Sequence, residues 1–93
     1  MAKTAKEYRL LSEYDLTLDD YKNMLNKQSH VCAICKQKNG DKDLFVDHDH
    51  ITGEVRGLLC RQCNFGIGHF KDNPDLTSAA TRYLMKFQNR SLI

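Results

Sequence analysis

All four cysteines of the chain fall into two Cys-x-x-Cys pairs, and this feature constrains the fold more than any other. The cysteines are Cys32, Cys35, Cys60 and Cys63, and 24 residues separate the two pairs. Two thiolates three positions apart can bind one ion from a tight turn, and two such turns complete the tetrahedron of sulfur atoms that Zn²⁺ accepts. We therefore predict one structural Zn²⁺, whose four sulfur ligands leave no open position for a reacting water.

The length of the chain makes such a cross-link useful. A domain of 93 residues buries only about two-thirds of the surface that its unfolded chain exposes, so the stability that its core alone supplies is marginal.

Two alternative roles for the cysteines are disulfide bonds and a thioredoxin-like redox pair. The N-terminal segment lacks the apolar stretch of a secretory signal, which predicts a reducing compartment and disfavours disulfides. No βαβ pattern surrounds either pair, which disfavours the redox motif.

The composition is that of a globular chain without a membrane span. Hydrophobic residues make up 41% and charged residues 28% of the sequence, values that argue against a disordered or fibrous protein. No apolar run approaches the ~20 residues that cross a bilayer. The formal net charge is only +2, and four thiolates around one Zn²⁺ would cancel it. Any contact with nucleic acid must therefore come from the local placement of Arg and Lys or from a bound cation.

The hydrophobic pattern predicts helices in the first third of a single small α+β domain that spans residues 1–93. Residues 1–16 give a weak signal for a short helix or an arm. Thr17 and Asp20 form the sequence pattern of a capping box, and they start a helix that we expect to end near residue 28.

A β-hairpin and two helices are predicted to follow. The strands of the hairpin are residues 44–46 and 55–59, joined by a loop that turns at Thr52 and Gly53. A short helix is expected over residues 61–70. The last helix begins at Asn73, with Pro74 in the first helical position, and its apolar residues follow the i, i+3, i+4 pattern as far as Phe87.

Four titratable residues, Asp47, His48, Asp49 and His50, lie where the first strand ends and a loop begins. One interpretation is a solvated turn in which the Asp side chains accept hydrogen bonds from backbone N–H groups. The other is an active site, because Asn64 directly follows the second cysteine pair, at the start of a helix that can pack on the hairpin. Carboxylate and amide oxygens suit Mg²⁺ or Mn²⁺, and an imidazole suits a general base.

With these motifs, the sequence resembles the phage recombination endonuclease VII family within the HNH, or His-Me finger, nucleases. The resemblance covers residues 14–87 and is carried by CAIC at positions 32–35 and by VDHDHITGEVRGLLCRQCN at positions 46–64. It implies a zinc-stapled ββα-metal core with flanking helices, in which the four cysteines hold the Zn²⁺.

The resemblance also implies the chemistry. It assigns a divalent cation, Mg²⁺ or Mn²⁺, to Asp47 and Asn64 and the role of catalytic base to His48, while Asp49 and His50 match the same motif. The implied activity is a metal-dependent DNA endonuclease that nicks duplex or cleaves branched DNA and leaves 5′-phosphate and 3′-hydroxyl ends. A cation is needed to neutralise the phosphate, and a base is needed to deprotonate water.

The implied partner is DNA, in the cytoplasm of the host cell if a phage encodes the chain. The oligomeric state is not indicated by the sequence, which is compatible with a monomer and with a homodimer. The sequence departs from the junction-resolving member of the family at Phe45, where that enzyme has a further His, and at Ile67, where it has a carboxylate. A second interpretation is a non-catalytic, zinc-stapled module that binds nucleic acid or protein.

Other polar residues have two interpretations each. Arg56 could bind the scissile phosphate or form a surface ion pair with Glu54 or Asp49. His69 is interpreted as a surface or packing residue rather than a second metal ligand, and His30 as unnecessary to a site with four cysteines. The C-terminal segment carries basic residues that are either a solvated helix face or contacts to the DNA backbone. These residues are Lys71, Arg82, Lys86 and Arg90.

Overall fold

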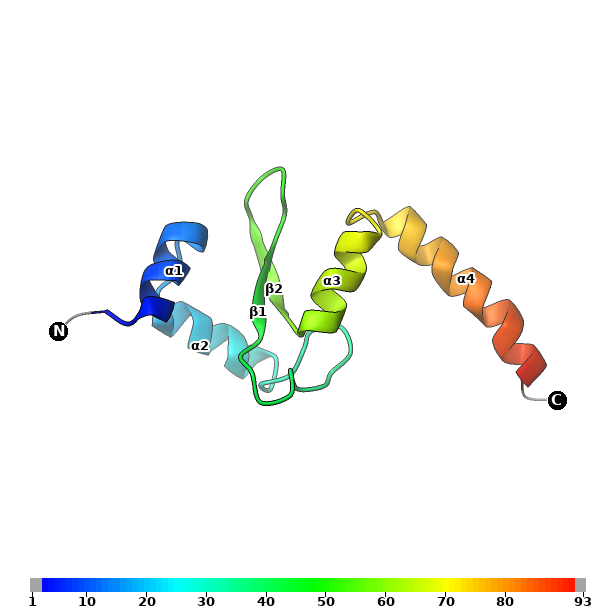
Figure 1. Cartoon of the computed structure of the whole chain (residues 1–93), viewed down its shortest axis with the longest axis horizontal. Coiled ribbons are helices and arrows are strands. Elements are labelled where there is room, and N and C mark those ends of the chain that lie inside the picture. Colours follow the sequence, from blue (N-terminus) through cyan, green and yellow to red (C-terminus); the bar gives the residue numbers. More distant parts are fainter. Residues whose placement is uncertain (1–2, 92–93) are drawn as a thin grey trace.

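The computed structural model describes residues 3–91, with side chains described as far as residue 88. In this range the helices are α1 (Ala5–Tyr14), α2 (Leu18–Lys27), α3 (Arg61–His69) and α4 (Pro74–Ser91), and the strands are β1 (Phe45–His48) and β2 (Val55–Leu59). The hairpin of β1 and β2 lies between α1 and α2 on one side and α3 and α4 on the other (Figure 1). The predicted small α+β architecture is confirmed. None of the helices in this range is long and apolar enough to cross a membrane.

Helix α1 occupies the segment whose sequence predicts a short helix or an arm. Its start is fixed by a capping box, in which the Thr4 hydroxyl accepts the Glu7 N–H and the Glu7 carboxylate accepts the Thr4 N–H, each at 3.2 Å. These bonds satisfy N–H groups that have no partner inside the helix. Leu10 anchors the helix in the core. The Thr-x-x-Glu pattern marks the start of the helix, although the apolar periodicity of this segment is too weak to predict the helix by itself.

Helix α2 begins as its sequence predicts. The Thr17 N–H donates to the Asp20 carboxylate at 2.9 Å, and the Asp20 N–H donates to the Thr17 hydroxyl at 3.0 Å. Tyr21 lies on the inner face of the helix and is almost fully buried. Its hydroxyl donates to the carbonyl of Leu44 at 2.7 Å. This bond ties α2 to the segment that enters the hairpin.

The two strands pair antiparallel in a register that is interrupted once. Asp47 lies opposite Gly57, and the next pair joins His48 to Val55, which leaves Arg56 as the extra residue of a β-bulge. The prediction for β2 is confirmed. The prediction of a first strand over residues 44–46 is wrong in its bounds, because β1 begins at Phe45 and ends at His48. Ladder pairing depends on the partner backbone: Asp47 pairs with Gly57 before the bulge, and His48 pairs with Val55 after it.

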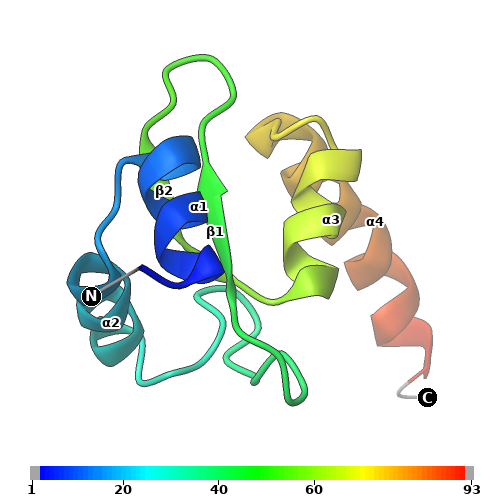
Figure 2. The same cartoon turned by 60° about the vertical axis from the view of Figure 1, so that its left-hand side comes forward.

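A small core lies between the hairpin and the first two helices, and two of its side chains are cysteines. Its buried members are Leu10, Tyr21, Cys32, Leu44, Val46, Leu58, Leu59 and Cys60. Helix α2 packs on β2, and α3 packs on β1 (Figure 2). A core of this size supplies little stability alone, so the cysteines matter both as apolar side chains and as possible metal ligands.

Gln28, the C-cap of α2, binds the edge of β2 through its side chain. Its amide nitrogen donates to the carbonyls of Val31 and Leu58, and its carbonyl oxygen accepts the Leu58 N–H, all at 2.9 Å. The Gln28 side chain therefore satisfies backbone groups that a neighbouring strand would otherwise pair.

We expect Gln28→Ala to lower the free energy of unfolding by about 2 kcal/mol, because the N–H of the fully buried Leu58 loses its acceptor. Urea unfolding followed by circular dichroism measures this change. Asn23→Ala, an exposed substitution on the same helix, is the control and should shift stability by less than about 0.5 kcal/mol. Equal midpoints for the two variants would contradict the role of Gln28.

Helix α4 starts as predicted but leaves the core. The Asn73 side-chain oxygen accepts the Asp75 N–H at 2.9 Å, and Pro74 is the first helical residue. Tyr83 and Leu84 are 62% and 64% exposed. The helix projects from the hairpin and α3 (Figure 1), and the whole molecule, α4 included, extends 61 Å along its longest axis. Its apolar pattern therefore predicts the helix but not a packing partner within the residues described.

Candidate active site

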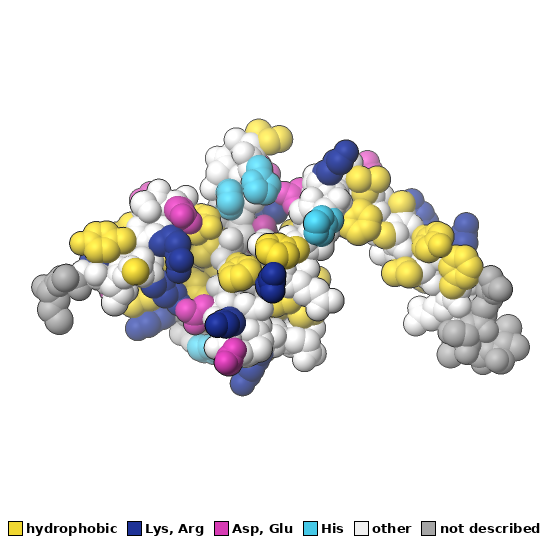
Figure 3. Space-filling view, viewed as in Figure 1, with side chains coloured by type: hydrophobic (Ala, Val, Ile, Leu, Met, Phe, Trp, Pro, Cys, Tyr) yellow, Lys and Arg dark blue, Asp and Glu magenta, His cyan; other side chains and the backbone are white. Residues whose placement is uncertain are grey.

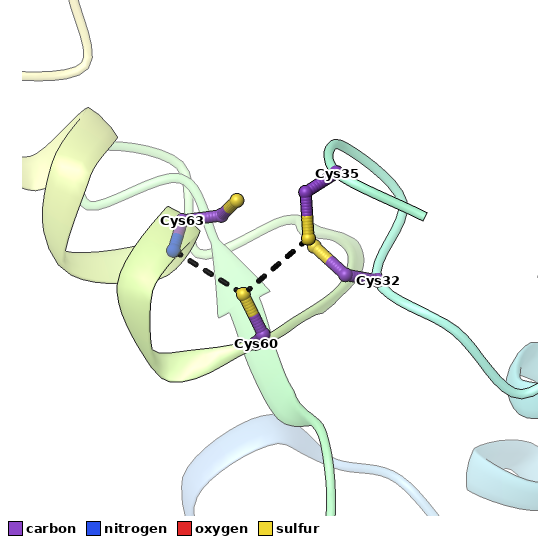
Figure 4. Close-up of side chains that lie close together, drawn as sticks. All are labelled: Cys32, Cys35, Cys60 and Cys63. Atoms are coloured by element: carbon purple, nitrogen blue, oxygen red, sulfur yellow. Dashed lines mark hydrogen bonds between the residues drawn. The ribbon is translucent and has the colours of Figure 1, made fainter. Parts of the chain in front are cut away.

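The four cysteines come together as their spacing predicts, and we call them the cysteine cluster. One pair lies in the turn after α2, and the other lies at the start of α3, where Cys60 is the N-cap. All four sulfur atoms lie within 4.8 Å of one another (Figure 4). The Cys35 and Cys60 sulfurs are 3.8 Å apart, and the edge of a tetrahedron whose corners lie ~2.3 Å from Zn²⁺ is about 3.8 Å. The cluster has the size and the ligand set for a zinc ion.

The backbone prepares the cluster for a cation. The N–H of Ile34 donates to the Cys32 sulfur and the N–H of Cys63 to the Cys60 sulfur, both at 3.4 Å. Burial alone would raise the pKa of the Cys32 thiol, but surrounding backbone N–H groups lower that pKa to about 6. Burial and the neighbouring sulfurs raise the pKa of Cys63 to about 12. A bound dication would favour the thiolate at each position.

The cysteine cluster is the tightest group of potential metal ligands among the side chains that the structure describes. Across residues 3–91, no other group of three or more Cys, His, Asp or Glu side chains brings its ligand atoms this close together. His30 is near the first pair in sequence, but its ring lies 2.9 Å from the Asn26 side-chain oxygen and the side chain is exposed.

A cavity of about 640 Å³ lies between the hairpin, α3 and the end of α1, and we call it the site cavity. Its polar lining consists of Asp47, His48, His50, Asn64, His69 and Asp72. Tyr14 and Phe65 form part of its apolar wall. The cavity therefore brings together the three residues to which the sequence assigns a cation and a base.

The β-bulge helps two consecutive residues to line one cavity. Side chains alternate between the faces of a regular strand, so Asp47 and His48 would point in opposite directions. The register shift falls between these two residues, and both line the site cavity. Without the bulge Arg56 would lie opposite His48, on the other face from Asp47, whereas in the structure it reaches the Asp47 carboxylate.

Asp47 is 8% exposed and its carboxylate is bound by a guanidinium. Arg56 Nε donates to one carboxylate oxygen and Nη2 to the other, both at 2.8 Å. This bidentate pairing raises the pKa of Arg56 above its ordinary value. The partners of Arg56 are therefore not Glu54 or Asp49, the candidates from sequence. A buried carboxylate requires a compensating cation, and the guanidinium supplies it.

Asp72, in the connection between α3 and α4, is a site residue that the sequence did not indicate. One of its carboxylate oxygens lies 3.4 Å from Arg56 Nη2 and 3.7 Å from His50 Nε2. Lys71 and Asp72 both have a left-handed backbone, with φ of 59° and 54°, which costs roughly 1–2 kcal/mol per residue outside glycine. No neighbouring residue in the sequence indicates this role for Asp72, because Arg56 and His50 lie at least 16 positions away from it.

The histidines of the site gather on one face of the molecule (Figure 3). His48 is half-buried, with its ring centroid 5.5 Å from that of Tyr14 and 4.8 Å from that of His50. His50 and His69 are exposed and line the site cavity. His69 is therefore at the surface, as the sequence suggests, but on the wall of the candidate site.

Asp49 has a structural position in the hairpin turn and is not in the wall of the site cavity. One of its carboxylate oxygens accepts the backbone N–H groups of Ile51 and Thr52 at 2.8 Å and 3.0 Å. These bonds lower the pKa of Asp49. Gly53 completes the turn with φ of 77°. Of the basic C-terminal residues, Arg90 lies outside those whose side chains the structure describes.

Comparison with known proteins identifies a family whose sequences resemble most of this chain. The model of the family described as recombination endonuclease VII matches residues 7–86. The Gene 59 protein of Mycobacterium phage L5 is 42% identical over 86 residues, which cover 90% of this chain and 52% of the relative. The Gene 59 protein of Mycobacterium phage D29 is 41% identical over 87 residues, 91% of this chain and 53% of the relative.

This chain therefore spans about half the length of these phage relatives. No solved structure matched it. The family match begins within α1 and ends within α4, and it includes the cysteine cluster and all the polar residues that line the site cavity. The chain belongs to the recombination endonuclease VII family.

Proposed function

We propose that this chain is a metal-dependent DNA endonuclease, in which β1, β2 and α3 form a ββα-metal core of the HNH, or His-Me finger, type. The proposal is carried by the meeting of Asp47, His48 and Asn64 in one cavity. Family membership supports a nuclease role and DNA as the substrate. The cysteine cluster is the proposed site of a structural Zn²⁺, which would fix α3 against the segment before the hairpin.

Asp47 and Asn64 would hold the catalytic divalent cation, Mg²⁺ or Mn²⁺. Their carboxylate and amide oxygens are the hard ligands that these ions prefer. The buried Asp47 carboxylate binds the guanidinium of Arg56, so the ion would share this carboxylate with Arg56 or replace it there. The bound ion would neutralise the scissile phosphate and stabilise the leaving 3′ oxygen.

His48 would act as the general base. Its imidazole would take a proton from the attacking water, whose oxygen bonds to phosphorus while the bond to the 3′ oxygen breaks, and the leaving 3′ oxygen would take a proton from solvent water. This step leaves 5′-phosphate and 3′-hydroxyl ends. Packing between Tyr14 and His50 restricts the ring, which keeps the base oriented toward the cavity and reduces the cost of ordering it during the reaction.

A cleavage assay with supercoiled plasmid tests this proposal. Nicking should require Mg²⁺ or Mn²⁺, stop when EDTA is added, and fall about 10²-fold or more in His48→Ala, which lacks the base. His30→Ala is the matched control, since this exposed histidine lies outside the site cavity. Undiminished nicking by purified His48→Ala would remove His48 from the mechanism.

Arg56 and Asp72 would control access to the Asp47 carboxylate. A cation on Asp47 would compete with the Arg56 guanidinium for the same carboxylate, and Asp72, whose oxygen lies 3.4 Å from Arg56 Nη2, can keep the guanidinium nearby. We expect Asp72→Asn to weaken Mn²⁺ binding by roughly threefold to tenfold, because a charged acceptor contributes about 1 kcal/mol more than a neutral one. Electron paramagnetic resonance of free Mn²⁺ measures this affinity. Asp75→Asn, on the exposed start of α4, should bind Mn²⁺ like the unmodified chain.

The Arg56–Asp47 bridge is also the observation that favours the second candidate, a non-catalytic zinc-stapled module. In that case the bridge is a permanent structural ion pair, and Mn²⁺ would not bind at the site cavity. Absence of nicking with every cation, on both plasmid and branched DNA, would favour this candidate. Because the relatives are phage proteins, the proposed nuclease would act on DNA inside the host cell.

A further inference from the structure

A second cavity, of about 570 Å³, adjoins the site cavity beside α1. The walls of both include Tyr14, Val46 and Asn64, so a polymer bound in one can continue into the other. Its remaining walls come from α1, the loop before β1 and the start of α3. We call it the basic groove because four cationic side chains line it, Lys6, Arg9, Lys42 and Arg61.

The charge of the basic groove differs from that of the whole chain. Its four cationic side chains are accompanied by a single carboxylate, Asp43, whereas the whole chain has a formal charge of only +2. Lys6 is paired with Asp43 at 2.9 Å. Arg9 and Lys42 are exposed and form no ion pair with the side chains of residues 3–88, those that the structure describes. These two groups are available to an anion from outside the protein.

Hydrogen bonds hold the walls of the groove in place. The Asn39 side chain donates to the carbonyl of Asp43 at 2.8 Å and accepts the backbone N–H of Arg61 at 3.0 Å. These bonds tie the loop that carries Lys42 to the start of α3. The wall of the groove is therefore built before any ligand binds, which lowers the entropy cost of binding.

Aromatic rings lie next to the cationic groups. The Arg61 guanidinium is 5.3 Å from the centroid of the Phe65 ring, which is 49% exposed and lines the site cavity. Phe45 is partly exposed in the groove itself. Cationic side chains that bind phosphates, interleaved with rings on which bases stack, are the features that recognise a nucleic-acid strand.

We propose that the basic groove binds the DNA strand on one side of the scissile phosphate, with Arg9 and Lys42 contacting its phosphate groups. This inference rests on the proposed function, because the scissile phosphate must occupy the site cavity. The basic residues Arg82 and Lys86 of α4 line neither cavity. They are therefore the matched control for a change in net charge.

The test compares two double variants of the full chain, Arg9→Gln with Lys42→Gln and Arg82→Gln with Lys86→Gln. Binding of a fluorescein-labelled DNA duplex is followed by anisotropy, with Zn²⁺ present and no Mg²⁺ or Mn²⁺, across a range of salt concentrations. The groove variant should bind about tenfold more weakly, and the slope of log affinity against log salt should fall by about 2. In the plasmid assay its KM should rise with kcat nearly unchanged.

The control variant should keep both the affinity and the slope, although it loses the same charge. Equal losses in the two variants, or no loss in the groove variant, would overturn the assignment of the basic groove to DNA. A failure of the groove assignment can be distinguished from a failure of the proposed nuclease function. Nicking that is unaffected by the groove substitutions refutes the groove alone, whereas a selective loss of binding in a chain that never nicks DNA supports the groove and refutes catalysis.

Discussion

Cys60→Ser is expected to unfold the chain, although serine keeps most local interactions of Cys60. Cys60 is the N-cap of α3, where its sulfur accepts the Cys63 N–H, and serine is among the best residues for that position. Loss of folding would therefore report the loss of a metal ligand rather than the loss of the cap. A structural Zn²⁺ contributes about 10–16 kcal/mol of apparent binding energy, as much as the whole stability of a typical domain, about 5–15 kcal/mol.

Three measurements check this expectation. The unmodified chain should contain one zinc per molecule by elemental analysis, and a chelator should abolish its cooperative thermal transition. Cys60→Ser should lack both the metal and the transition in circular dichroism. Ala33→Ser, between the cysteines of the first pair, is the matched control and should keep both. A cooperative transition in metal-free Cys60→Ser would show that the core suffices without zinc.

Most features predicted correctly from sequence depend on near neighbours in the chain, although the cysteine cluster also joins Cys35 to Cys60 across 25 positions. The spacing within each cysteine pair, the Thr17 capping box and the Asn73–Pro74 helix start each involve residues within four positions of one another. Such patterns are visible in sequence because the geometry that they specify is closed by one turn of backbone. The bounds of β2 were also predicted correctly, but the C-terminal end of β1 was not.

The features that the sequence did not indicate depend on distant segments. Gln28 binds β2 across 30 positions, and Asp72 approaches Arg56 across 16 positions. Both contacts require the packed hairpin, and the second also requires a bulge whose position no local residue specifies. The basic groove collects side chains from α1, the loop before β1 and α3. Of the basic C-terminal residues, Lys71, Arg82 and Lys86 have side chains that the structure describes, and these three line neither the groove nor the site cavity.

Helix α4 illustrates a different limit. Its apolar residues have helical spacing, but Tyr83 and Leu84 are mostly exposed, so periodicity identified an amphipathic helix without identifying what covers it. A hydrophobic pattern reports which face of a helix avoids water, and it does not report whether the covering surface belongs to the same folded unit. The single domain over residues 1–93 stays a prediction, because the surface that covers the apolar face of α4 is not identified and residues 1–2 and 92–93 lie outside the described range.

Asp47→Asn is expected to reduce nicking by at least about 10³-fold while the chain stays folded. Asp47 is the only carboxylate of the two proposed ligands of the catalytic cation, and the substitution removes it. The bound cation stabilises the charge on the phosphate by several kcal/mol, and this stabilisation would be lost. The amide oxygen that replaces the carboxylate could still accept one hydrogen bond from Arg56, and Asp72 would keep the guanidinium partly paired. The free energy of unfolding should therefore fall by only about 1–3 kcal/mol.

Mn²⁺ binding separates this explanation from a loss of structure. Electron paramagnetic resonance should detect Mn²⁺ bound to the unmodified chain but not to Asp47→Asn, while thermal unfolding of the variant stays cooperative. Asp49→Asn is the matched control, because an amide oxygen at position 49 can still accept the backbone N–H groups of Ile51 and Thr52, and this variant should bind Mn²⁺ and nick DNA normally. If Asp47→Asn retained Mn²⁺ with unchanged affinity, the cation would have to bind elsewhere, and the Arg56–Asp47 bridge would be a structural ion pair.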